Sequence, residues 1–150
     1  MWETVEDRDA IPFSLPAIRA LTTLPFEAPV TFLTGDNGSG KSTLVEAIAM
    51  SMGFNAEGGT KSFDFAHRPS ESRLRAHLRI RRNIGAGRGG FFLRAESFFN
   101  LATAVEQLGV GESYGDRPLH EQSHGESFLA LVNNRFEPDG IYGSSRWGGE

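Results

Sequence analysis

The stretch Gly35-Asp36-Asn37-Gly38-Ser39-Gly40-Lys41-Ser42-Thr43 decides the fold of this chain. It matches the pattern G-x-x-x-x-G-K-[ST] at every fixed position. In this pattern the glycines let the backbone turn sharply around phosphate groups, and the helix that follows directs its positively polarised N-terminus toward them. Lys41 is expected to reach the β- and γ-phosphates, and the Ser42 hydroxyl to ligate Mg²⁺. The whole stretch therefore predicts a nucleoside triphosphate site, with a glycine-rich turn and an exposed lysine as the alternative.

The residues on either side of this loop fit its expected context. Residues 29–34 read Pro-Val-Thr-Phe-Leu-Thr, a β-branched and aromatic run that predicts a buried central strand. After the loop, apolar residues recur at helical spacing up to Gly53, which predicts a helix that ends there. These apolar residues are Leu44, Val45, Ala47, Ile48 and Met52. A strand, a phosphate loop and a helix in this order predict an α/β fold of the P-loop NTPase type.

The composition is that of a globular chain of one domain. The chain has 150 residues, 39% of them hydrophobic and 12 of them Phe, which is enough for a core. It has no cysteine, so disulfides and thiolate metal sites are excluded. The acidic N-terminus lacks the pattern of a signal peptide, and no apolar run approaches the ~18 residues of a membrane span. We therefore expect a cytoplasmic protein with no membrane segment.

Charge is distributed unevenly along the chain. Its net charge is −4, but residues 67–94 hold eight arginines against one acid, Glu71, a local charge of +7. From Arg73 to Arg81 basic residues alternate with apolar ones, which predicts a half-buried strand with a basic face extending to Arg82. Such a face suits nucleic acid or an acidic protein surface. The alternative is an edge strand whose arginines prevent edge-to-edge pairing.

Further elements are predicted on both sides of this region. Residues 91–95 resemble a buried strand, and Ser97 is a natural N-cap for a helix with apolar residues from 98 to 108. A second helix is expected over residues 125–136, and surface loops over 55–72 and 109–119. The opening segment, broken by prolines, is expected to lie across a sheet edge. Trp2 or Phe13 within it is a candidate for stacking on a base, with core packing as the alternative.

Three motifs in order carry a resemblance to a known family. The phosphate loop is followed by Phe-Phe-Leu-Arg-Ala-Glu-Ser-Phe-Phe-Asn at 91–100 and by His-Glu-Gln-Ser-His-Gly-Glu-Ser-Phe at 120–128. Over residues 10–142 this set resembles stand-alone predicted ATPases similar to the nucleotide-binding domains of ABC-type and SMC-like ATPases. The resemblance implies an ABC-ATPase-like P-loop fold with a mixed sheet flanked by helices. It also implies ATP and Mg²⁺ as ligands and ATP hydrolysis as the reaction.

The resemblance also implies roles for residues outside the loop. In ABC-type domains a Leu-Ser-Gly-Gly-Gln signature opens a helix and contacts the γ-phosphate of nucleotide held by a partner subunit. Ser123 and Gly125 occupy that place here and imply a homodimer, although His124 and Glu126 depart from the motif. An ordinary helix cap is the alternative for Ser123.

A catalytic role beside that of Lys41 is implied for Glu96. It lies where ABC-type domains place a glutamine that touches Mg²⁺ and the attacking water. Capping the first turn of its helix is the alternative. His120 and His124 are candidates for the γ-phosphate sensor, with surface histidines as the alternative.

The expected Walker B element is absent. In the resemblance, a hydrophobic strand ending in Asp-Glu follows the second helix, and that pair supports Mg²⁺ and the attacking water. Here residues 138–142 begin such a strand, but 143–150 read Gly-Ser-Ser-Arg-Trp-Gly-Gly-Glu, with no apolar run and no Asp-Glu pair. We therefore expect an ATPase domain over 1–142, truncated or frame-shifted after Tyr142, with an atypical tail over 143–150. The alternative is a short protein in which Asp139 or another acid acts.

Two other functions use the same loop. A small P-loop kinase would transfer the γ-phosphate to a nucleotide or metabolite, and the arginines before residue 91 resemble its lid. A non-hydrolysing module would use ATP only to gate association with a partner.

Overall fold

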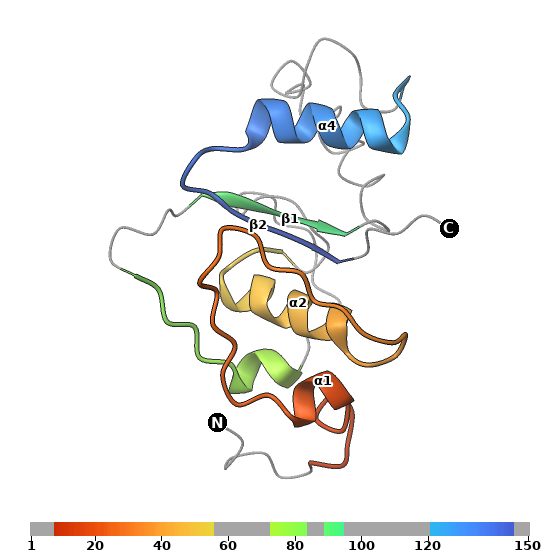
Figure 1. Cartoon of the computed structure of the whole chain (residues 1–150), viewed down its shortest axis with the longest axis vertical. Helices are drawn as coiled ribbons and strands as arrows, with labels where there is room; N and C mark the ends of the chain where they lie inside the picture. The colour runs from red at the N-terminus through yellow and green to blue at the C-terminus, as the bar shows by residue number, and fades with distance from the viewer. Residues whose placement is uncertain (1–7, 56–72, 84–88, 95–120, 146–150) are drawn as a thin grey trace.

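The computed structural model describes residues 8–55, 73–83, 89–94 and 121–145 (Figure 1). Its elements, in chain order, are α1 (Pro16–Arg19), α2 (Lys41–Ser51), the 3₁₀ helix η1 (Arg73–His77), β1 (Gly90–Arg94), α4 (His124–Arg135) and β2 (Ile141–Ser145). None of the helices in these four ranges combines the length and the apolarity needed to cross a membrane.

The sheet of the described residues consists of β1 and β2, which pair in parallel. Their register runs from Gly90 opposite Ile141 to Arg94 opposite Ser145. Phe91, Phe92 and Leu93 are all buried, as expected for a parallel strand covered on both faces. Figure 1 shows α4 over one face of the sheet and α2 over the other. The fold is thus α/β in three layers.

Helix α2 joins the two clusters of the core. On one side Leu44 and Ala47 pack with Phe13, Ile18 and Leu74. On the other, Ala49 packs with Phe54 and with Phe92 of β1. Burial of each large apolar side chain contributes about 1.5–3 kcal/mol. The helix that begins inside the phosphate loop is therefore held firmly by its own apolar residues.

Several predicted elements are confirmed. Helix α2 starts at Lys41, and Gly53 adopts a φ of 89° just beyond its end, as the stop at that glycine predicted. Strand β1 spans 90–94 and α4 spans 124–135, each within one residue of its predicted bounds. Strand β2 continues to Ser145, three residues past Tyr142, the last apolar residue of the predicted strand.

The predicted central strand over 29–34 is wrong. No strand forms there, and Val30 and Phe32 are 65% and 83% exposed. A strand depends on neighbours for its hydrogen bonds and for burial of its side chains. Within the described ranges, β1 and β2 pair only with each other, so this strand-forming sequence is left without a strand to pair with.

The predicted strand over 73–81 is also wrong. Residues 73–77 form η1, and 78–83 follow without strand pairing. Leu74 is fully buried in the core, and the His77 ring packs edge-on against Phe13, with 5.1 Å between ring centroids. Residues three apart share a side in a 3₁₀ turn, so these two anchors favour η1 over the alternating pattern. The same packing places Phe13 in the core, the simpler of its two predicted roles.

Other predictions fall outside the described residues. They concern Trp2, Glu96, Ser97, His120, the helix over 98–108, the loop over 109–119, all but the start of the loop over 55–72, and the tail beyond 145. Of the predicted mixed sheet, the described ranges contain the parallel pair.

Candidate functional site

The loop that precedes α2 has a backbone that only glycine adopts readily. Gly35, Gly38 and Gly40 have φ values of 144°, 79° and 100°. Gly40 also lacks room for a side chain, because a methyl group there would lie 3.0 Å from Leu15 Cβ. The glycines of the motif are thus required by the shape of the loop.

Lys41 lies across this loop. Its Nζ donates hydrogen bonds to the carbonyl oxygens of Gly35, at 2.6 Å, and Asp36, at 2.7 Å. The ammonium group at the start of α2 therefore returns to the first two residues of the motif. An anion that enters the loop meets this positive charge together with the N-terminus of an eleven-residue helix.

The N-terminal segment holds the loop against the core. Ala17 of α1 donates its backbone N–H to the Ser39 carbonyl oxygen at 2.9 Å, and Leu15 contacts the position of Gly40. The Ser39 hydroxyl is buried and makes no hydrogen bond to the described residues. A buried polar atom without such a bond is costly, so this hydroxyl suits a ligand or water in the loop.

The loop fits a triphosphate with Mg²⁺. Ser42 is exposed in the first turn of α2, where its hydroxyl is accessible to an ion. The described ranges contain no cluster of three or more His, Asp or Glu side chains able to hold a metal. Mg²⁺ commonly uses one or two protein ligands together with phosphate oxygens and water. Ser42 would be such a ligand, with phosphate completing the site.

The candidate signature residues form an ordinary helix cap. The Ser123 N–H donates to Glu126 Oε2 at 2.8 Å, and the Glu126 N–H donates to Ser123 Oγ at 3.3 Å. This reciprocal pair is a capping box. Gly125 is exposed, and a methyl group there would contact nothing within 4 Å. Helix α4 lies across the sheet from α2, so the chain itself does not bring Ser123 into the layer of Lys41 (Figure 1).

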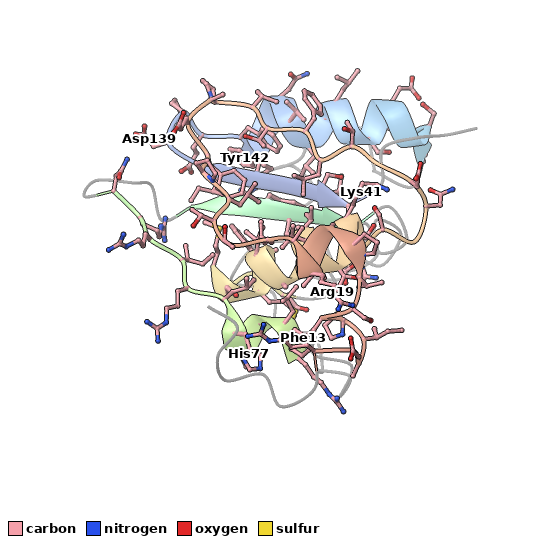
Figure 2. The ribbon with its side chains drawn as sticks, turned by 60° about the horizontal axis from the view of Figure 1, so that its bottom comes forward. Phe13, Arg19, Lys41, His77, Asp139 and Tyr142 are labelled. Carbon is pink, nitrogen blue, oxygen red and sulfur yellow. The ribbon has the colours of Figure 1, made fainter. Side chains whose placement is uncertain are left out.

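Asp139 lies at the wrong end of the sheet to act with the loop. It is exposed in the turn that leads into β2. Figure 2 shows Asp139 and Lys41 at opposite ends of β1 and β2, with Lys41 toward the carboxyl ends of the strands. Ligands of α/β folds bind outside those carboxyl ends. The geometry does not support Asp139 as a substitute for the absent acid.

One contact near the site was not foreseen from the sequence. Arg94, the last residue of β1, forms an ion pair with Glu46 of α2, with 3.4 Å between Nη2 and Oε1. Both side chains are about three-quarters buried. In the sequence, an arginine at the end of an apolar strand indicates that a charged partner is needed. The sequence does not identify Glu46 as that partner, because it lies far from Arg94 along the chain.

Comparison with known proteins agrees with the loop. A family model described as AAA domain matches residues 14–98, more than half of the chain, and this match includes the loop, α2 and β1. No curated protein and no solved structure matches the chain. The matched region and the loop geometry agree on a nucleotide-binding, ATPase-type P-loop domain. The chain belongs to the AAA domain family.

Proposed function

We propose that this chain binds ATP with Mg²⁺ through residues 35–43. The observation that carries the proposal is the Lys41 ammonium, held on the carbonyls of Gly35 and Asp36 inside a turn of left-handed glycines. Phosphate oxygens would replace these carbonyls as partners of Lys41. Backbone N–H groups of the loop and the N-terminus of α2 would bind the remaining phosphate charge.

ATP hydrolysis is the reaction we propose for the family fold. Lys41 would stabilise the charge that develops on the transferred phosphoryl group, and Ser42 would hold the ion that bridges the phosphates. Glu96, two residues past the end of β1, is our candidate for orienting the attacking water.

We further propose an ABC-like homodimer in which Ser123 and Gly125 of one subunit approach the nucleotide of the other. The N-terminus of the twelve-residue helix α4 would attract the γ-phosphate. The Glu126 carboxylate already occupies that helix end through its hydrogen bond to Ser123. A negative carboxylate repels phosphate, so nucleotide would have to displace Glu126 from the capping box.

Thermal unfolding tests the binding proposal directly. A ligand that binds only the folded state raises stability by about 2.7 kcal/mol at a hundred times its Kd. We expect ATP with Mg²⁺ to raise the Tm, ATP with EDTA to raise it less, and AMP to leave it unchanged. An identical Tm in all of these conditions would contradict nucleotide binding by the loop.

Product analysis separates the three functions that share this loop. Release of inorganic phosphate without an added acceptor supports an ATPase. Phosphate that appears on a nucleotide or metabolite supports the kinase instead. Binding without turnover, combined with ATP-dependent dimerisation in light scattering, supports the non-hydrolysing module.

A further inference from the structure

We propose that an arginine strip on this protein binds the phosphate backbone of nucleic acid, a function separate from the nucleotide site. The strip consists of Arg73, Arg75, Arg79, Arg81 and Arg82. All five residues are exposed. Residues 73–83 contain these five arginines and no acidic residue, so this segment is strongly positive although the whole chain has a net charge of −4.

The core fixes the strip in place. Leu74 is fully buried, Leu78 packs against the same cluster, and the His77 ring contacts Phe13. The five arginines lie before, between and after these three anchors, and all are exposed. Figure 2 shows the side chains of the extended segment after η1 directed away from the body of the protein. The guanidinium groups are therefore presented on a backbone that is attached to the rigid part of the fold.

The structure does not support the alternative in which these arginines prevent edge-to-edge pairing of a strand. Basic residues on an edge strand prevent pairing between sheets. Residues 78–83 are not part of a sheet, so they have no strand edge to protect. Since the alternative explanation no longer applies, a binding role becomes the better account of this charge.

The spacing and chemistry of the strip suit a repeating phosphate partner. Arg79 and Arg81 are separated by one residue, so an extended backbone would place them on the same side about 6.6 Å apart. A guanidinium binds phosphate oxygens through two parallel hydrogen bonds. Ile80, which is 37% exposed, is the one exposed large apolar side chain among residues 73–83. Protein interfaces usually have an apolar or aromatic centre, which this strip lacks, so we favour nucleic acid over an acidic protein as the partner.

Fluorescence anisotropy with labelled single-stranded and duplex DNA tests this proposal. We expect the parent protein to bind at about 50 mM salt and to lose affinity steeply toward about 200 mM. Changing Arg79→Gln and Arg81→Gln together removes two phosphate contacts. This should weaken binding about tenfold at the lower salt and reduce the slope of log K against log salt by about 1.4–1.8.

The matched control removes the same charge elsewhere. Arg19→Gln with Arg135→Gln changes two exposed arginines outside the strip and should leave affinity nearly unchanged. A second control, Lys41→Ala, should also retain DNA binding, which separates this proposal from the nucleotide site. Thermal unfolding of each variant without DNA checks that the fold persists.

Three results would overturn the proposal. The first is that the parent binds neither single-stranded nor duplex DNA at about 50 mM salt. The second is that the Arg79/Arg81 variant binds DNA as tightly as the Arg19/Arg135 control does. The third is that polyglutamate of equal charge competes for the protein as well as unlabelled DNA does. The last result would assign the strip to acidic polypeptides.

Discussion

Arg94 and Glu46 join the end of β1 to the helix of the phosphate loop. Their Nη2 and Oε1 atoms lie 3.4 Å apart, and the side chains are 24% and 25% exposed. Glu46 lies one turn after Ser42 on α2, and Arg94 lies two residues before Glu96. The ion pair thus connects the proposed Mg²⁺ ligand to the segment that carries the proposed water-orienting residue.

Breaking this ion pair should destabilise the fold. Glu46→Gln or Arg94→Met alone removes this ion pair while one of its two partly buried charges stays in place, and we expect each to lower the free energy of unfolding by about 1–3 kcal/mol. The double variant should lose clearly less than the sum of the two, because the shared ion pair can be lost only once. Urea unfolding of the four proteins measures this coupling. Strictly additive losses would show that the pair does not interact in solution.

Gly40 should be more sensitive to substitution than Gly38. Both have positive φ, so an alanine costs about 1 kcal/mol of backbone strain at either site. At Gly40 the added methyl group also meets Leu15, whereas at Gly38 it meets nothing within 4 Å. We therefore expect Gly40→Ala to reduce both Tm and ATP affinity more than Gly38→Ala. Equal effects would contradict the described packing of the loop on the N-terminal segment.

Ser123 can be tested as a cap and as a phosphate contact separately. Ser123→Ala removes the N-cap and should lower stability by about 1 kcal/mol. Ser123→Asp keeps an acceptor for the Glu126 N–H, but it loses the 2.7 Å hydrogen bond that Ser123 Oγ donates to Glu126 Oε2 and brings two carboxylates together, so stability should be restored only in part. The added negative charge should nevertheless weaken ATP-dependent dimerisation if Ser123 faces a partner's γ-phosphate. Parent-like dimerisation of Ser123→Asp would leave Ser123 as a cap alone.

A substitution at Phe32 tests whether residues 29–34 are an exposed segment or a buried central strand. Its side chain is 83% exposed, so Phe32→Ser should change the free energy of unfolding by no more than about 0.5 kcal/mol. Phe92→Ser is the matched comparison, because Phe92 is fully buried and should cost about 3 kcal/mol or more. A loss at Phe32 as large as at Phe92 would show that residues 29–34 are buried.

The features that could be predicted from sequence are those determined locally. The glycines and Lys41 of the loop follow a pattern with a direct steric and electrostatic cause, and α2 and α4 follow helical periodicity with recognisable ends. The failures at 29–34 and 73–81 depend on partners distant in sequence. Val30 and Phe32 have the right residue types for a strand, but no strand within the described ranges pairs with them, while Leu74 and His77 are held by contacts with the core. The Arg94–Glu46 pair likewise arises only when β1 packs near α2.

Calorimetric titration with ATP and Mg²⁺ tests the proposed ATP site most directly, with three proteins compared: the parent, Lys41→Ala and Lys61→Ala. Lys61 is the only other lysine in the chain and so provides a control of equal charge. We predict saturable binding by the parent and by Lys61→Ala, and loss of that binding in Lys41→Ala. Equal binding by Lys41→Ala, or no binding by a folded parent, would contradict the assignment of residues 35–43 as the ATP site.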